Sequence, residues 1–302
     1  MTVIRTAVFF LYCLLCAAFT ANAAEKGISS TAEKTFWQKL EPGLELTRVP
    51  VTYIPTPSFF SEGVNLATPD RLASAPDPAT VTVTILRIDP EKFSFSLYMA
   101  SESGPKTLGE IAESENFVAA INAGMYQRDR STSTGHLRSP THANNPRIAT
   151  NFGAFFVAVP LDGSPPHARL LDRNTDDWQD ALKRYGLAMQ NYRMTAPGGR
   201  ILWKQTNRNH SIAALSQDTA GHILFILCSE PVAAADFITA LLRQHLNTSL
   251  VMYLEGGTEA ALLVNAGAVN FVEAGRHVSG LWGGSANLML PNVLGIRRTA
   301  RE

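Results

Sequence analysis

Hydrophobic and polar residues begin to alternate at residue 80, and this alternation predicts β-structure. Residues 81–86 read Val-Thr-Val-Thr-Ile-Leu and residues 93–97 read Phe-Ser-Phe-Ser-Leu, with Asp89 and Pro90 between them. A period of two is typical of a strand with one buried face, and an Asp-Pro pair favours a turn. The segment is therefore predicted to be a strand–turn–strand unit with one buried face.

Short apolar runs separated by polar loops continue toward the C-terminal part of the chain. They predict further strands at residues 117–121, 152–159, 186–194, 211–215, 222–228 and 250–254. Helical spacing replaces this pattern at residues 176–185 and, more clearly, at residues 233–246, where apolar residues recur every three or four positions. No repeat or long linker divides these elements. The pattern predicts one α+β domain over residues 80–302, built on a curved, mixed β-sheet with a few packed helices.

Residues 24–79 have a different composition, with prolines at positions 42, 50, 55, 57, 69, 76 and 78. Proline has no backbone N–H and interrupts both helices and sheets. We therefore predict a proline-rich leader on the main domain, with one strand at residues 46–53.

The first 23 residues have the order of a secretory signal. Arg5 precedes an apolar run over residues 7–19, and small residues follow at Ala21-Asn22-Ala23. This order predicts a signal peptide at residues 1–23 that is cleaved after Ala23. The run is shorter than the ~20 apolar residues of a membrane-spanning helix. We predict an exported protein, in the periplasm in preference to the extracellular medium, with no integral membrane segment after cleavage.

The hydrophobic content, charge and cysteine count of the chain exclude several classes of protein and partner. The 302 residues are 45% hydrophobic and 17% charged, which excludes an intrinsically disordered chain. Basic and acidic residues number 26 each and no basic block occurs, so nucleic acid is not a predicted partner. Cys228 is the single cysteine after the signal and lies in an apolar run, which indicates a core thiol rather than a nucleophile.

Two strands end abruptly on polar residues and glycines. The first runs into Asn122-Ala123-Gly124 and the second into Glu255-Gly256-Gly257. Glycine lets the backbone approach a ligand closely, and a carboxylate at a strand end can act as base or nucleophile. The alternative for each loop alone is a plain turn with a solvated side chain.

The order of several short motifs carries more information than either loop. The motifs are Asn122-Ala123-Gly124-Met125-Tyr126, Gly135, Asn151 before Phe152-Gly153, Arg208-Asn209 before a strand, Leu254-Glu255-Gly256-Gly257, and Pro291-Asn292-Val293-Leu294-Gly295. In this order and spacing, from about residue 80 to residue 297, the chain resembles the phosphodiester glycosidase family.

The resemblance implies roles for individual residues. Asn122 and Gly124 match the family's Asn-Gly-Gly or Asn-Ala-Gly loop, and Asn151 matches an asparagine before its central Phe-containing strand. Arg208 matches an arginine before the next strand. Glu255 takes the place of the usual aspartate in an Asp-Gly-Gly loop. A second departure is Gln190-Asn191-Tyr192, where many bacterial relatives look like Gln-Ser-Gly.

The chemistry of an anomeric phosphodiester fits this set of residues. The leaving group is a phosphomonoester, so a strong general acid is less necessary than in ordinary glycoside hydrolysis. One carboxylate must activate water or attack, and cationic and N–H donors must hold the phosphate. The resulting hypothesis assigns Glu255 as catalytic carboxylate with Asp129 as a second. The predicted substrate-binding residues are Asn122, Gly124, Asn151, Arg208, Arg138, Gly256 and Gly257.

No cofactor is required by this pattern. His136 and His142 share a polar loop, but no carboxylate completes a recognisable metal-ligand spacing. The sequence therefore leaves open whether a divalent cation binds, and the residues of a metal site are unknown.

The leading hypothesis is an exported hydrolase that cleaves the glycosidic bond of sugar phosphodiesters in envelope or extracellular glycans. Its partner would be a phosphorylated glycan or glycosyl phosphodiester. Two alternatives have the same fold: a non-catalytic protein that binds a phosphorylated glycan, and an accessory protein of exopolysaccharide assembly. Glutamate at position 255 in place of aspartate favours the first alternative.

Overall fold

The structure is a computed structural model that describes residues 36–55, 77–206, 208–276 and 287–299. The signal predicted at residues 1–23 lies outside the described residues. All described residues belong to one compact unit within Thr35–Glu302. Among them, no helix combines the length and the apolar character needed to cross a membrane.

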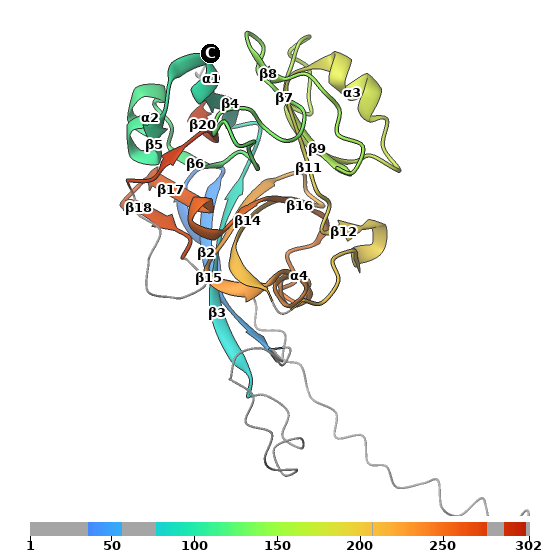
Figure 1. The fold of residues 1–302 in the computed structure, drawn as a ribbon. Helices are drawn as coiled ribbons and strands as arrows, with labels where there is room; N and C mark the ends of the chain where they lie inside the picture. The colour runs from blue at the N-terminus through green and yellow to red at the C-terminus, as the bar shows by residue number, and fades with distance from the viewer. Residues whose placement is uncertain (1–35, 56–76, 207, 277–286, 300–302) are drawn as a thin grey trace, which may run out of the picture. The chain divides into compact units, whose positions relative to one another are not determined.

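Three larger β-sheets form most of this unit (Figure 1). The six-stranded sheet has the order β1 (Gln38–Glu41), β2 (Leu44–Tyr53), β3 (Ala79–Ile88), β15 (Ile223–Ala233), β14 (Asn209–Asp218) and β16 (Thr248–Gly256). One five-stranded sheet has the order β18 (Val269–Ala274), β17 (Ala261–Ala266), β6 (Ala119–Asn122), β20 (Asn292–Arg298) and β4 (Phe93–Met99). The other has the order β10 (Ala168–Asp172), β9 (Ala154–Pro160), β11 (Tyr185–Asn191), β7 (Leu137–Arg138) and β8 (Ala143–Asn145).

Smaller elements cover the sheets and connect them. Two short two-stranded sheets pair β12 (Thr195–Ala196) with β13 (Arg200–Ile201) and β19 (Met289–Leu290) with β5 (Lys106–Thr107). The helices are α1 (Ala100–Ser103), α2 (Leu108–Glu115), α3 (Trp178–Arg184) and α4 (Ala234–Leu242), with 3₁₀ turns η2 (Pro197–Gly199) and η3 (Gly257–Glu259).

These elements confirm the α+β class with curved sheets and few helices. The strand pairings described are antiparallel, so the single mixed sheet of the prediction is divided into three antiparallel ones. Antiparallel strands need only short connections, which agrees with the scarcity of helices.

The strand–turn–strand segment differs from its prediction in two respects. β3 and β4 both form, but they do not pair with each other: β3 pairs with β2 and β15, and β4 pairs with β20. The chain changes sheets at Asp89 because both strands face one shared core. In that core, the Phe95 ring lies edge-on to Phe156 and Phe225, at centroid distances of 5.2 and 6.3 Å.

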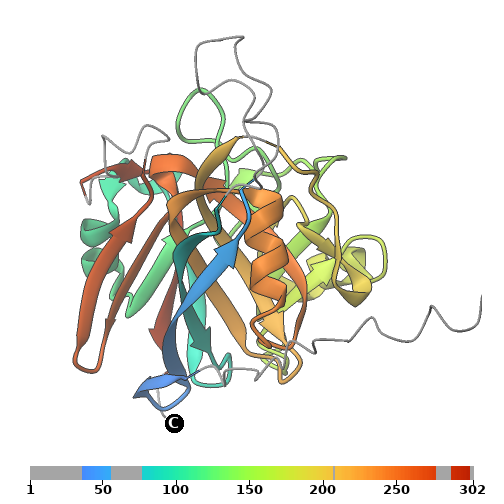
Figure 2. The same cartoon turned by 90° about the horizontal axis from the view of Figure 1, so that it is seen from below.

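The middle of β3 is also buried on both faces instead of one. Leu86 and Ile88 face the core between the sheets, whereas Val83 and Ile85 face a second core under α4. Figure 2 shows α4 beside β2, over the six-stranded sheet. A helix covering the outer face explains why apolar residues occupy both faces of the strand.

The predicted leader contributes directly to this sheet. The strand expected at residues 46–53 is present as β2, and it pairs with β3 along its whole length, from Leu44 with Ile88 to Tyr53 with Ala79. Its residues 44–53 are therefore an integral part of the fold. The domain boundary at residue 80 stays a prediction.

The structure confirms Cys228 as a core thiol. Its side chain is fully buried in the core under α4, and burial raises the pKa of the thiol to about 12. A thiol that stays protonated at neutral pH is a poor nucleophile.

Candidate functional site

Strand ends from all three larger sheets meet at one place. β6 ends at Asn122, β11 at Asn191 and β16 at Gly256, one residue after Glu255. The Asn191 Nδ2 donates to the carbonyl oxygen of Leu254 at 2.9 Å, which ties β11 to β16. The Glu255 loop therefore lies beside the end of β11, and Gly124 brings the Asn122 loop to the same place.

Gly124 packs directly on this junction. Its φ is +100°, and a Cβ at this position would lie 3.1 Å from Asn191 Nδ2 and 3.9 Å from the Leu254 oxygen. Glycine is thus required both by the backbone conformation and by the space available. The Asn122–Gly124 loop and the Leu254–Glu255 segment therefore both contact the Asn191 amide.

Glu255 is the titratable centre of the junction. Its backbone pairs with Ala213 of β14, and its Oε1 accepts a hydrogen bond of 2.9 Å from the Gly256 N–H. Burial raises the pKa of its carboxyl to about 7; the Gly256 N–H lowers the pKa and the charge of Glu259 raises it further. A carboxyl with a pKa near neutrality is suited to accept and release a proton at physiological pH.

Gly256 leaves the space that two aromatic side chains occupy. A Cβ here would lie 2.5 Å from His210 Cδ2, 2.5 Å from the Tyr253 hydroxyl and 2.9 Å from the Ser211 carbonyl oxygen. Burial lowers the pKa of His210 and raises that of Tyr253. Both groups are therefore neutral beside Glu255 at pH 7.

A second acidic residue, Glu259, lies on the η3 turn that follows β16. The Tyr126 hydroxyl donates to Glu259 Oε1 at 2.8 Å, and the Thr258 hydroxyl donates to Glu259 Oε2 at 2.9 Å. The Arg130 guanidinium carbon lies 5.5 Å from the centroid of the Tyr126 ring. The hydrogen bond from Tyr126 joins the loop after β6 to the turn after β16.

The predicted asparagines have different surroundings. Asn122 is buried; its Oδ1 accepts from the Ala261 N–H at 3.1 Å, and its Nδ2 has no partner among the described residues. Asn151 is exposed, and its Nδ2 donates to the Tyr192 hydroxyl at 3.0 Å. Asn122 therefore braces β17 against β6, whereas Asn151 is free to contact a ligand.

A row of aromatic rings connects Asn151 to the strand of Glu255. Tyr192 lies edge-on to Phe152 and to Trp203, with centroid distances of 4.4 and 6.1 Å. Trp203 lies 5.0 Å from Tyr253, two residues before Glu255. Tyr192 stands where the resemblance leads to glycine, so this row is a feature of the present chain. Rings beside polar groups are a common surface for sugar contacts.

Arg138 and Arg208, the two arginines predicted to bind substrate, have different contacts. The Arg138 guanidinium donates to the carbonyl oxygens of Leu182, Tyr185 and Gly186, so it holds the end of α3 against β11. The Arg208 side chain is exposed and has no hydrogen-bond or ion-pair partner among the described residues. Arg208 lies just before β14, two residues from His210, and its donors are available to a ligand.

Asp129 belongs to a turn of its own. Its carboxylate accepts from the Ser131 N–H at 3.0 Å, the Thr132 N–H at 2.9 Å and the Thr132 hydroxyl at 2.6 Å. These bonds, led by the Thr132 hydroxyl, lower the pKa of Asp129. No hydrogen bond or ion pair in the described part of the chain connects it to Glu255.

Sequence reasoning missed Arg276. Its backbone N–H donates to the Ser211 hydroxyl at 2.7 Å, and its exposed side chain follows Gly275, where a Cβ would lie 2.0 Å from the Gly257 oxygen. Arg276 thus lies next to the Glu255-Gly256-Gly257 loop. Its Gly-Arg dipeptide gives no specific signal in the sequence, because its position depends on the pairing of β17 with β18.

The histidines of the polar loop do not form a cluster. His136 is buried, whereas the His142 Nε2 lies 2.9 Å from the Ser101 hydroxyl. Among the residues that the structure describes, no group of three or more His, Cys, Asp or Glu side chains is arranged to hold a metal ion. The cofactor requirement stays a prediction.

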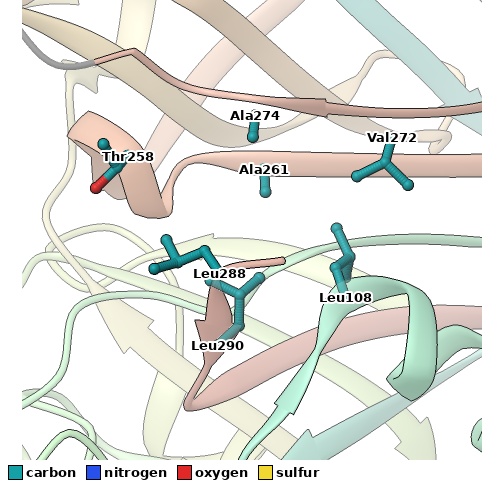
Figure 3. Close-up of a pocket in the computed structure, with 7 residues that line it drawn as sticks. All are labelled: Leu108, Thr258, Ala261, Val272, Ala274, Leu288 and Leu290. Atoms are coloured by element: carbon teal, nitrogen blue, oxygen red, sulfur yellow. The ribbon is translucent and has the colours of Figure 1, made fainter. Parts of the chain in front are cut away.

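An apolar pocket lies beside the η3 turn (Figure 3). It is lined by Leu108, Thr258, Ala261, Val272, Ala274, Leu288 and Leu290. Among the described residues that line it, the Thr258 hydroxyl is the single polar side-chain group and none is charged. A phosphate group would therefore find no ionic partner in this pocket.

Comparisons with known proteins identify similar folds and a family. A search of curated proteins finds no match. The fold is similar to that of the catalytic domain of zebrafish N-acetylglucosamine-1-phosphodiester alpha-N-acetylglucosaminidase, auto-inhibited by its pro-peptide. The TM-score is 0.56 at 12% identity, over 87% of this chain and 86% of that one. It is also similar to a hypothetical protein from Synechocystis, with a TM-score of 0.55 at 12% identity over 88% of this chain; the match spans 64% of the Synechocystis chain.

The family assignment rests on the sequence. The model of the phosphodiester glycosidase family matches residues 115–296, which is more than half of the chain. This range includes Asn122, Glu255 and the three strand ends that meet there. The chain belongs to the phosphodiester glycosidase family.

Proposed function

We propose that this protein is a hydrolase that cleaves the glycosidic bond of sugar phosphodiesters, with Glu255 as its catalytic base. The observation that carries the proposal is a partly buried carboxyl with a pKa near 7, at the point where strands from three sheets end. Family membership supports the reaction class, and the zebrafish domain, named for an N-acetylglucosamine 1-phosphodiester, supports the substrate class.

The proposed reaction follows from the roles of these residues. Glu255 accepts a proton from water as the water oxygen attacks the anomeric carbon. The bond from that carbon to the phosphate oxygen breaks, and its electron pair leaves with the phosphomonoester. The products are free sugar and phosphomonoester, and Glu255 later releases the proton to solvent. The leaving group needs no protonation, which agrees with neutral His210 and Tyr253 beside the base.

The remaining residues supply binding. Arg208 is an exposed cation just before β14, and Arg276 is an exposed cation whose backbone contacts Ser211 of β14; we propose that both hold the phosphate. Asn151, with the Tyr192 and Trp203 rings, would contact the sugar. We propose envelope or extracellular glycans as the source of substrate and the periplasm as the preferred location, on the sequence pattern of residues 1–23.

The rate of hydrolysis is expected to rise with pH. Only ionised Glu255 accepts a proton, and burial raises its pKa from 4.5 to about 7. The inactive protonated form therefore predominates below pH 7 and the active form above it, with half-maximal kcat/KM near pH 7. The measurement is kcat/KM for an N-acetylglucosamine 1-phosphodiester across this range. A rate that falls as pH rises through 7 would instead make Glu255 a general acid.

Arg208→Ala is expected to weaken substrate binding. Hydrogen bonds to charged groups contribute about 1.5–3 kcal/mol, so we expect KM to rise by roughly 10-fold or more, with a smaller change in kcat. Arg243→Ala is the matched control, because Arg243 is also exposed but follows α4, before the start of β16. Equal KM values for the two variants would remove Arg208 from the phosphate site.

A second candidate function is binding of a phosphorylated glycan without cleavage. One observation favours it: position 255 is glutamate where the resemblance leads to aspartate, and one added methylene displaces the carboxylate. A panel of glycosyl phosphodiesters separates the two functions. Release of free sugar supports the hydrolase, whereas a raised melting temperature without release supports the binding protein.

A further inference from the structure

Glu259 is fixed in position by groups from two loops. Its Oε1 accepts from the Tyr126 hydroxyl at 2.8 Å, and its Oε2 accepts from the Thr258 hydroxyl at 2.9 Å. Gly257 begins the η3 turn, and a Cβ there would lie 3.8 Å from Oε2, so the carboxylate folds back over its own turn. Two hydroxyl donors on one carboxylate favour a single orientation of the side chain.

This carboxylate acts electrostatically on Glu255. Glu255 lies at the end of β16, and Glu259 lies on the η3 turn that follows this strand. The negative charge of Glu259 opposes ionisation of Glu255. Tyr126 experiences both carboxylates: burial, the hydrogen bond to Glu259 and the two negative charges raise its pKa to about 12. Tyr126 therefore stays a neutral donor over the whole range in which Glu255 titrates.

We propose that Glu259, held in place by the Tyr126 hydroxyl, is the second carboxylate of the site and controls the proton that Glu255 carries. This inference rests on the proposed function, since it assigns Glu259 as a positioning residue for the base. It replaces Asp129, whose bonds are confined to its own turn.

Other charged or titratable groups near Glu255 do not oppose its ionisation in the same way. His210 and Tyr253 are neutral at pH 7, and the Arg130 cation lies over the Tyr126 ring, where it opposes the rise in the pKa of Tyr126. The charged and titratable groups of this region are Glu259 on η3, Tyr126 and Arg130 on the loop after β6, Tyr253 on β16, His210 on β14, and the cations Arg208 before β14 and Arg276 after β18. Glu259 is the one carboxylate in this set.

The test is Glu259→Gln in the full chain. Glutamine keeps an oxygen that accepts from Tyr126 but removes the negative charge. We expect the midpoint of the kcat/KM profile to move to lower pH, so the variant gains activity relative to its plateau on the acid side. The shift is only part of the displacement from 4.5 to about 7, because burial is the larger cause. Structural damage alone would lower activity at every pH and leave the midpoint in place.

A direct titration separates this inference from the proposed function. Carboxyl chemical shifts of ¹³C-labelled glutamate report the midpoint of Glu255 without substrate, with Glu255→Gln identifying its signal. Glu273→Gln is the control, because Glu273 also accepts from two hydroxyls, those of Thr84 at 2.9 Å and Ser229 at 2.6 Å, but does not contribute to the pKa of Glu255. An unshifted midpoint in Glu259→Gln overturns the inference, even if the enzyme is active. A shifted midpoint supports the electrostatic control, even if no phosphodiester is cleaved.

Tyr126→Phe tests the holding contact. The variant keeps both charges but leaves Glu259 Oε1 without its donor, so the carboxylate turns toward water and its effect on Glu255 weakens. We expect a midpoint shift in the same direction as in Glu259→Gln, but smaller. A midpoint equal to that of the unmodified protein would overturn the role of Tyr126.

Discussion

Glu255→Gln is expected to abolish hydrolysis and, at the same time, to stabilise the fold at alkaline pH. Loss of a general base typically costs 10²–10⁴-fold in rate, and we expect a loss of about 10³-fold. Glutamine keeps the oxygen that accepts from the Gly256 N–H, so the loop conformation is retained. The activity and the stability of this variant therefore change in opposite directions.

The sign of the stability effect follows from proton binding. Burial raises the pKa of Glu255 from 4.5 to about 7, so the folded state binds more protons than the unfolded state between these values. The free energy of unfolding of the unmodified protein therefore falls as pH rises from about 4.5 to 7. In Glu255→Gln this group no longer titrates, so the free energy of unfolding should not show this decrease. Above pH 7 the variant should therefore be more stable than the unmodified protein by on the order of 2 kcal/mol.

Denaturant midpoints at acid and alkaline pH measure this difference. The control is Glu113→Gln, because Glu113 is exposed on α2 and its neutralisation should leave the pH dependence unchanged. A Glu255→Gln variant that keeps full activity would exclude Glu255 as the base. One whose stability depends on pH like that of the unmodified protein would show that Glu255 does not titrate with a raised pKa in the folded state.

Gly256→Ala is expected to damage both the fold and the reaction. The added methyl group would lie 2.5 Å from the His210 ring and the Tyr253 hydroxyl, and 2.9 Å from the Ser211 oxygen. The Ser211 oxygen belongs to the backbone of β14, which cannot move aside without disturbing its pairing with β16. Overpacking of this kind typically costs about 1–3 kcal/mol, and we expect a loss of about 2 kcal/mol with at least a roughly tenfold lower kcat.

Gly109→Ala is the matched control for this substitution. Gly109 lies in α2, and a Cβ there has no heavy atom within 4 Å. Alanine favours a helix over glycine, so this variant should be as stable as the unmodified protein or slightly more stable. Thermal unfolding of both variants, with kcat for each, measures the contrast. Equal melting temperatures would mean that His210, Tyr253 and Ser211 move to accommodate the methyl group with no loss of stability.

Local patterns in the sequence were sufficient for most strands and for the two principal loops. Alternation and apolar runs located β2, β9, β14, β15 and β16, and helical spacing located α3 and α4. The Asn122 and Glu255 loops were expected at strand ends, and in the structure both contact the Asn191 amide. Each of these features depends on residues that are neighbours in the sequence.

Features set by distant contacts were not predictable in this way. The separation of β3 from β4 depends on pairing partners near residues 225 and 295, and the burial of both faces of β3 depends on α4. The Tyr126–Glu259 contact joins residues 133 positions apart, and neither residue type signals the other. One local signal was overlooked: Thr107 and Glu110 form a capping box that marks the start of α2.

The position of β20 has a consequence for how the protein folds. This strand lies between β4 and β6, and Arg298, at its end, bonds to Glu41 at the other end of the described chain. A ribosome delivers β20 after the other four strands of this sheet, so β4 and β6 have no shared partner until residues 292–298 have been made. Pairings this distant in sequence slow folding, because the chain must first close a long loop. Acquisition of activity should therefore be an all-or-none event that requires β20, and a nascent chain that stops short of this strand should have no functional site.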